Sequence, residues 1–195
     1  MTNSKNNKKK KKDANDGRFE LRISGSGGQG AILAAILFAQ ASGKNPKYNV
    51  VQTQSYGPEA RGGASRADVV ISTNEIYYPK TMKLDLLMAF TQEACDKYFI
   101  DLKPGGLLIV DSNLVTKVPT KNSYGFPFVR MAREQIGIAM VANVIALGVI
   151  VELTGLISHE DMKAVIMERA PKGTEEKNLK ALNLGFDLAK KTKRK

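Results

Sequence analysis

The chain has 195 residues and a formal net charge of +11, and 43% of its residues are hydrophobic. This length allows one domain of about 150–180 ordered residues, with a core that needs no disulfide or metal. The charge lies at the two ends: residues 1–17 contribute +4 and residues 190–195 contribute +5, which leaves +2 for residues 18–189. We therefore predict a disordered basic tail (1–17), a single nearly neutral domain (18–189) and a second basic tail (190–195).

The lysines of the first tail are concentrated in residues 8–12, where they could contact RNA or an acidic partner. The surrounding residues are mostly polar and cannot bury enough surface to order themselves, which favours a solvated tail. The body lacks the basic stripe that a nucleic-acid-binding protein needs. A protein that binds nucleic acid through its tails is therefore kept only as an alternative.

The chain has one cysteine and one histidine, and these low counts argue against several kinds of site. One cysteine, Cys95, can form no disulfide within the chain and cannot hold an iron–sulfur cluster, which needs about four thiolates. One histidine, His159, argues against a zinc site. The N-terminal lysines are not followed by an apolar signal segment, and no apolar run of about 18 residues could span a membrane. We expect a cytoplasmic protein.

The first two thirds of the body predict alternating strands and helices. The glycine-rich segment 25–30 separates the first strand from an alanine-rich helix, and Gly43, Asn45 and Pro46 end that helix. Residues 55–63 carry several turn-forming residues and predict a loop. The predicted strands are 19–23, 49–54, 65–72, 84–90 and 107–111, and the predicted helices are 31–41 and 92–100, the latter stopped by residues 103–106.

The last third predicts helices only. A helix begins near residues 129–135, and residues 138–153 contain so little polarity that their helix is buried on nearly all sides. Ser158 is a candidate N-cap for a helix over 160–168, and Thr174 for a final helix to about residue 189. The order of elements predicts an α/β fold: a three-layer, Rossmann-like α/β/α arrangement with a mostly parallel sheet and a helical C-terminal third.

The segment after the first strand matches the pattern G-x-G-x-x-G through Gly25, Gly27 and Gly30. Such a loop lets the backbone approach a phosphate, and the N-terminus of the next helix offers free N–H groups. A dinucleotide site also needs an acidic residue about 20 positions later, but no acid occurs before Glu59. A simple NAD enzyme is therefore disfavoured, while an anion site and a purely structural tight turn remain equal alternatives.

The second polar segment, residues 52–63, follows the second predicted strand. By strand order it leaves the same carboxyl edge of the sheet as the glycine loop, where open α/β sheets bind ligands. Arg61 lies between small residues and could contact a phosphate or carboxylate through two hydrogen bonds. An ion pair from Arg61 to Glu59 or to a neighbouring subunit is an equally good interpretation.

Three other residues are weaker candidates. Cys95 lies in a helical pattern without a local base, so packing is a simpler role than nucleophilic attack. His159 follows a predicted N-cap and is most simply a surface residue. Asp111 ends an apolar strand, where a cap or turn role is as ordinary as a functional one.

Five segments together resemble the gamma subunit of 2-oxoacid:ferredoxin oxidoreductases, and the 2-oxoglutarate type more than the pyruvate type. They are residues 24–30, 52–65, 102–106, 142–148 and 153–156. The run QTQSYGPEARGG within the second segment is far more specific than the glycine loop. The resemblance covers about residues 19–188 and leaves out the basic tails.

The resemblance implies a complex that converts a 2-oxoacid and coenzyme A into acyl-CoA, carbon dioxide and reduced ferredoxin. It implies thiamine diphosphate, Mg²⁺ and iron–sulfur clusters on alpha and beta partner subunits, with a delta subunit where the complex has one. This chain would support assembly, carry no catalytic residue or metal, and reach ferredoxin only through the complex. Residues implied to face coenzyme A or the catalytic subunit are Gly25, Gly27, Gly28, Gln29, Gly30 and Arg61. A stand-alone nucleotide- or NAD-binding Rossmann-like protein is the alternative.

Overall fold

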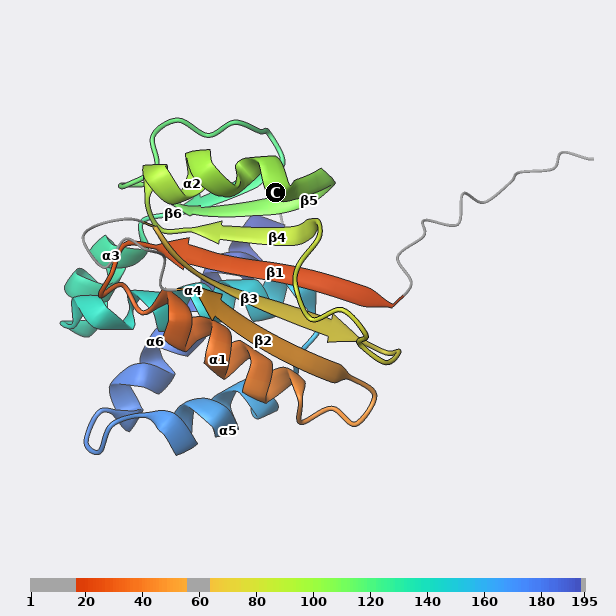
Figure 1. The fold of residues 1–195 in the computed structure, drawn as a ribbon. Helices are drawn as coiled ribbons and strands as arrows, with labels where there is room; N and C mark the ends of the chain where they lie inside the picture. The colour runs from red at the N-terminus through yellow and green to blue at the C-terminus, as the bar shows by residue number, and fades with distance from the viewer. Residues whose placement is uncertain (1–16, 56–63, 194–195) are drawn as a thin grey trace, which may run out of the picture.

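The computed structural model describes residues 17–55 and 64–193. The strands are β1 (Arg18–Gly25), β2 (Asn49–Ser55), β3 (Ser65–Ser72), β4 (Leu84–Ala89), β5 (Leu102–Asp111) and β6 (Ser123–Phe126). The helices are α1 (Ala31–Ser42), α2 (Gln92–Tyr98), α3 (Phe128–Met131), α4 (Ala142–Thr154), α5 (His159–Arg169) and α6 (Glu175–Lys193). The strands form one sheet in the order β2-β3-β1-β4-β5-β6 (Figure 1).

The sheet is mostly parallel, as predicted. Strand β1 runs parallel to β4, β4 to β5 and β5 to β6, whereas β3 runs antiparallel to both β1 and β2. Because both neighbours of β3 oppose it, β1 and β2 point the same way and end at the same edge. Gly25 at the end of β1 pairs with Ser65, and Ser55 at the end of β2 pairs with Arg66. The glycine loop and the second polar segment therefore both leave the carboxyl edge.

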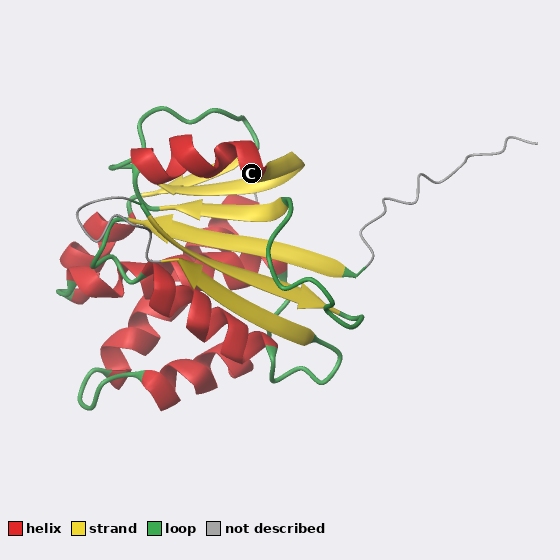
Figure 2. Ribbon diagram, viewed as in Figure 1, coloured by secondary structure: helices red, strands yellow, loops and turns green. Residues whose placement is uncertain are grey.

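Helices cover both faces of the sheet, but unequally (Figure 2). Apolar side chains of α1, α4, α5 and α6 form the main core against one face, with Leu21, Ile23 and Val69 on the strands. A smaller core lies on the other face, where α2 packs Ala94 and Cys95 against β4 and β5. The predicted three-layer α/β fold is thus confirmed, with a thin second helical layer.

The pleat of β1 explains why the second layer is thin. Leu21 and Ile23 enter the main core, so the alternate residues Glu20, Arg22 and Ser24 point to the face that carries α2. Strand β3 alternates in the same way. The α2 face over β1, β3 and β2 is therefore largely polar, with Val70 and its partner Val51 as apolar exceptions.

Three elements differ from the sequence-based expectation. Strand β5 begins at Leu102 and includes Pro104, although residues 103–106 predicted a loop, and its pairing with β4 shifts register between Leu84 and Leu86. Strand β6 was not predicted. The helix expected over 129–135 is four residues of α-helix followed by a π-helical turn that ends at Gly137.

The helical third packs through a close crossing of α4 and α6. A Cβ on Gly148 would lie 2.9 Å from the Cα of Gly185, and a Cβ on Gly185 would lie 2.8 Å from the Cα of Gly148. Only glycine allows the two backbones this approach. None of the described helices has the length and apolar character needed to cross a membrane.

Candidate functional site

The glycine loop joins β1 to α1, and both of its ends are fixed by packing. Gly30 precedes α1 with a φ of +72°, a conformation that other residues rarely adopt. A Cβ on Gly30 would lie 3.0 Å from the Cγ of Asn143, whose Nδ2 donates to the carbonyl of Gly30 at 3.2 Å. A Cβ on Gly25 would lie 2.9 Å from the Cβ of Phe90. These two glycines therefore have structural roles.

The middle of the loop is open. Gln29 closes the turn, because its Oε1 accepts a hydrogen bond from the backbone N–H of Ser26 at 2.8 Å. Gly27 and Gly28 are exposed, and a Cβ on either would meet no atom within 4 Å. No side chain of the described residues caps the N-terminus of α1, which starts next to them. Of the predicted loop residues, these two glycines have space for a ligand.

Strand pairing brings the second polar segment to the glycine loop. The hydroxyl of Ser24 donates to the carbonyl of Ser65 at 2.8 Å, and the hydroxyl of Ser65 donates to the carbonyl of Gly25 at 3.0 Å. The start of β3 is therefore bound to the end of β1, where the glycine loop begins. Arg61, the candidate anion ligand in this segment, lies outside the described residues.

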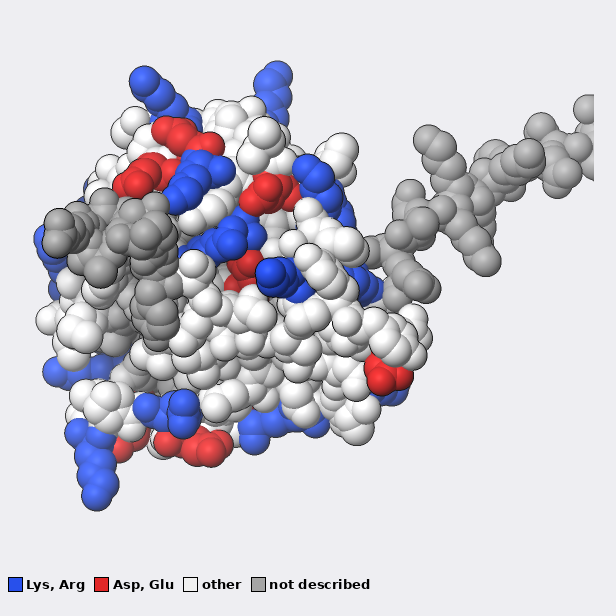
Figure 3. Space-filling view, in the orientation of Figure 1, with Lys and Arg blue, Asp and Glu red and all other residues white. Residues whose placement is uncertain are grey.

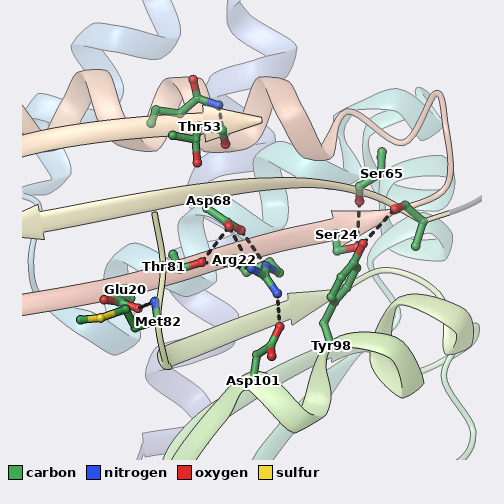
Figure 4. A network of polar contacts seen from close by, with 12 residues as sticks. Glu20, Arg22, Ser24, Thr53, Ser65, Asp68, Thr81, Met82, Tyr98 and Asp101 are labelled. Atoms are coloured by element: carbon green, nitrogen blue, oxygen red, sulfur yellow. Dashed lines mark hydrogen bonds and ion pairs between the residues drawn. The ribbon is translucent and has the colours of Figure 1, made fainter. Parts of the chain in front are cut away.

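A second site, which the sequence did not predict, lies on the α2 face of the sheet (Figure 4). Arg22 of β1 donates from Nε and Nη2 to the carboxylate of Asp68 on β3 at 2.6 and 2.9 Å. Its Nη1 also bonds Asp101, and its Nη2 bonds the hydroxyl of Thr81 at 3.0 Å. Burial by itself lowers the pKa of Arg22, but the bonds and charges of Asp68 and Asp101 raise it overall. The guanidinium stays charged and fixed.

Tyr98 of α2 connects this network to a second arginine. The Arg22 guanidinium lies 4.8 Å from the centre of the Tyr98 ring, and that of Arg66 lies 5.7 Å from it. The hydroxyl of Tyr98 donates to the carbonyl of Ala64 at 3.2 Å, which holds the ring in place. Cation–π contacts of this kind hold both arginines over one aromatic surface.

The sequence contains one signal for this network. Apolar residues of β1 alternate with Glu20, Arg22 and Ser24, so one face of the first strand had to be polar. The sequence could not predict which residues bind Arg22. Asp68, Thr81 and Asp101 come from three separate segments, and only the fold brings them to Arg22.

Packing or hydrogen bonds hold each of the three weaker candidate residues in the fold. Cys95 is buried, and burial followed by the charge of Asp96 raises the pKa of its thiol to about 11. His159 stacks on Phe186, with ring centres 3.8 Å apart. Asp111 accepts hydrogen bonds from the backbone N–H groups of Asn113 and Val129, at 2.9 Å each. Among the described residues, no group of three or more His, Cys, Asp or Glu side chains could hold a metal ion.

The chain matches known proteins over its whole body. The model of the family described as pyruvate ferredoxin/flavodoxin oxidoreductase matches residues 20–188. The 2-oxoglutarate synthase subunit KorC of Methanocaldococcus jannaschii is 48% identical over 177 residues, which cover 89% of this chain and 95% of that protein. The ketoisovalerate oxidoreductase subunit VorA of Methanothermobacter marburgensis is 32% identical over 88% of this chain but only 36% of its own length.

A solved structure has the same fold. The gamma subunit of the keto/oxoacid ferredoxin oxidoreductase from Geobacter sulfurreducens PCA superposes with a TM-score of 0.81 at 46% sequence identity. The alignment covers 90% of this chain and 98% of that subunit.

Proposed function

Because the chain belongs to the pyruvate ferredoxin/flavodoxin oxidoreductase family, we propose that it is the gamma subunit of a 2-oxoglutarate:ferredoxin oxidoreductase. The observation that carries the proposal is the 48% identity to a 2-oxoglutarate synthase subunit across nearly the full length of both proteins. The complex would convert 2-oxoglutarate and coenzyme A into succinyl-CoA, carbon dioxide and reduced ferredoxin.

The residues of this chain do not fit the iron–sulfur clusters or the thiamine diphosphate expected of such a complex. An iron–sulfur cluster needs about four thiolates, and the chain has one cysteine, which is buried in the core under α2. The sequence also has no Gly-Asp-Gly motif of the kind that holds thiamine diphosphate through magnesium. The carbanion chemistry and the electron transfer therefore belong to the alpha and beta subunits, and to a delta subunit where the complex has one.

The role of this chain toward coenzyme A would lie at the glycine loop. Gly27 and Gly28 offer backbone N–H groups and open space beside the uncapped N-terminus of α1, which suits a phosphate. Gly25, Gln29 and Gly30 would shape the loop and not contact the ligand. Arg61 would add a charged hydrogen bond to the coenzyme.

Two measurements test the proposal. Purification of the chain at native abundance should also yield thiamine-binding and cluster-binding subunits, and a complex that keeps full activity without this chain would refute it. In the assembled complex, Arg61→Ala should raise the KM for coenzyme A by about 10-fold, the effect of losing one charged hydrogen bond. The KM for 2-oxoglutarate should stay unchanged, and an unchanged KM for coenzyme A would remove Arg61 from the site.

The alternative function, a stand-alone nucleotide- or NAD-binding protein, finds no support in the relatives. It rested on Gly25, Gly27 and Gly30, of which Gly25 and Gly30 have packing roles that explain them. Titration calorimetry of the isolated chain with NAD would show no heat of binding if this alternative is wrong. The cytoplasmic location of the complex stays a prediction from the cysteine content and the N-terminal sequence.

A further inference from the structure

None of the helices that the structure describes covers the polar half of the sheet on the α2 side, and this half contains a cavity. Helix α2 packs on β4 and β5, whereas the face over β1, β3 and β2 carries Arg22, Asp68, Arg66 and Thr53. The cavity has a volume of about 480 Å³ and is closed on one side by residues 78–82. In the space-filling view, basic and acidic atoms lie close together in the upper part of the molecule, above a broad uncharged area (Figure 3).

The cavity has an excess of positive charge. Asp68 and Asp101 are both bound to Arg22, so the inner charges of the network satisfy one another. Arg66 and Lys80 also line the cavity, and neither forms an ion pair with any carboxylate of the described residues. Arg66 is half-buried and held over Tyr98, so it has already lost much of its hydration and conformational freedom. Such a cation binds a carboxylate at low entropic cost.

Buried carboxylates fix the segment that forms the wall of the cavity. Glu20 Oε2 accepts hydrogen bonds from the backbone N–H groups of Met82 and Lys83 at 2.6 and 2.9 Å. Arg18 donates to the carbonyl of Lys80 at 3.0 Å, and the hydroxyl of Thr81 donates to Asp68 at 2.8 Å. The wall is therefore held at several backbone positions without being part of the sheet.

Large apolar side chains surround this fixed wall. Tyr78 and Met82 line the cavity with 52% and 63% of their surfaces exposed. Ile100 is 76% exposed, and its carbonyl accepts a hydrogen bond from Lys83 at 3.1 Å, which joins it to the same wall. Tyrosine, methionine and arginine are enriched at protein interfaces, where lysine and glutamate are depleted. Exposed apolar groups around a preformed polar cavity are typical of a docking surface.

We propose that this face, defined by Arg66, Tyr78, Lys80, Met82 and Ile100, is the docking surface for the catalytic subunit of the complex. The proposal rests on the function proposed above. In VorA, the segment similar to this chain makes up only 36% of the protein. The other part of VorA is therefore covalently attached to that segment. A separate chain of this family needs a surface that replaces that covalent link. Acidic side chains of the catalytic subunit enter the cavity and pair with Arg66 and Lys80.

The test measures the dissociation constant between this chain and the remaining subunits, each purified in full length. Arg66→Glu should raise the Kd about 30-fold or more, because the charge reversal leaves a buried carboxylate of the partner unpaired. Lys80→Glu and Met82→Asp should each raise it as well. The matched controls are Lys177→Glu and Met167→Asp, which change exposed residues of α6 and α5 on the opposite side of the sheet and should leave the Kd unchanged.

A second measurement guards against variants that merely unfold. Hydrogen exchange of the wild-type complex should show the amides of Tyr78, Lys80 and Thr81 in the wall protected relative to the free chain. If the wild-type chain binds its partners but Lys80→Glu, Met82→Asp and this exchange pattern are all unchanged, the docking surface is wrong and the proposed function stands. If the wild-type chain does not bind the partners, the proposed function fails as well. Inorganic phosphate binding at Arg66 in the assembled complex would assign the cavity to a small anion and overturn the docking proposal.

Discussion

The Arg22 guanidinium combines near-complete burial with two carboxylate partners. Its side chain is 4% exposed, and that of Asp68 is 9% exposed. Taking two charges out of water is costly, so an ion pair of this kind contributes little net stability compared with apolar residues of the same size. The network instead fixes the arrangement of the chain, because it joins β1, β3, the segment before β4 and the turn after α2 at one point.

Removal of one charge from this network should be strongly destabilising. We expect Arg22→Met to lower the free energy of unfolding by about 3 kcal/mol or more, because Asp68 would stay buried without its cation. Arg22→Lys should cause a smaller decrease in the free energy of unfolding, since an ammonium group keeps the charge but cannot bond Asp68 twice and still reach Asp101. Urea denaturation measures both changes. A loss below about 1 kcal/mol for Arg22→Met would mean that Asp68 is hydrated.

The thiol of Cys95 should be inert in the folded chain. Its pKa is raised to about 11, mainly by burial, so the reactive thiolate is scarce at pH 8. We expect iodoacetamide to label the folded chain about 100-fold more slowly than the chain in denaturant. The folded state also keeps this proton to a higher pH than the unfolded state. The free energy of unfolding should therefore fall as the pH rises from about 9 to 11, and Cys95→Ala should remove that part of the pH dependence.

At the scale of elements, several features that depend on neighbouring residues in the sequence were predicted correctly. Strand β6 and the start of β5, which depend on pairing with distant residues, were not. The glycine loop, the alanine-rich helix and the N-cap at Ser158 are local features, and the structure confirms all three. Strand β6 has four residues, Ser123–Phe126, and exists because β5 offers it a free edge. The start of β5 contains Pro104 and Gly105, which predict a turn, yet pairing with β4 extends the strand through them. Tertiary pairing overrode local propensity in both cases.

The crossing of α4 and α6 makes a sharp prediction for two helical glycines. Glycine to alanine normally stabilises a helix by up to about 1 kcal/mol. At Gly148 and Gly185, however, a methyl group would meet the backbone of the facing helix, so we expect each alanine to cost about 2 kcal/mol. Thermal unfolding should show a Tm lower by about 4–8 °C.

The control for these variants is Asn183→Ala, an exposed position on the same helix α6. It should leave the Tm unchanged or raise it slightly, because alanine has the higher helix propensity. If Gly185→Ala behaves like this control, the two helices can separate without loss, and the close crossing does not contribute to stability.

At the scale of the whole molecule, the two candidate surfaces meet at one point. Strand β2 ends at Ser55, and β3 begins at Ser65, which pairs with Gly25 at the end of β1 on the carboxyl edge. Thr53, Ser55 and Arg66 also line the cavity on the α2 face. A catalytic subunit bound to that face would therefore lie next to the proposed coenzyme site. Docking and coenzyme binding would then be coupled through the joined ends of β1 and β3.

The uneven distribution of charge gives the last prediction. Deletion of residues 2–16 removes six lysines and two aspartates and lowers the formal charge from +11 to +7. Each lysine that contacts single-stranded RNA contributes about 0.7 to the slope of log K against log salt, so the slope should fall by as much as about 4. The coenzyme A-dependent activity of the complex should be unchanged, because the proposed coenzyme site lies in the body and not in the tail. RNA binding that keeps its affinity and its salt dependence after the deletion would instead place the polyanion site on the body or on the second basic tail, residues 190–195.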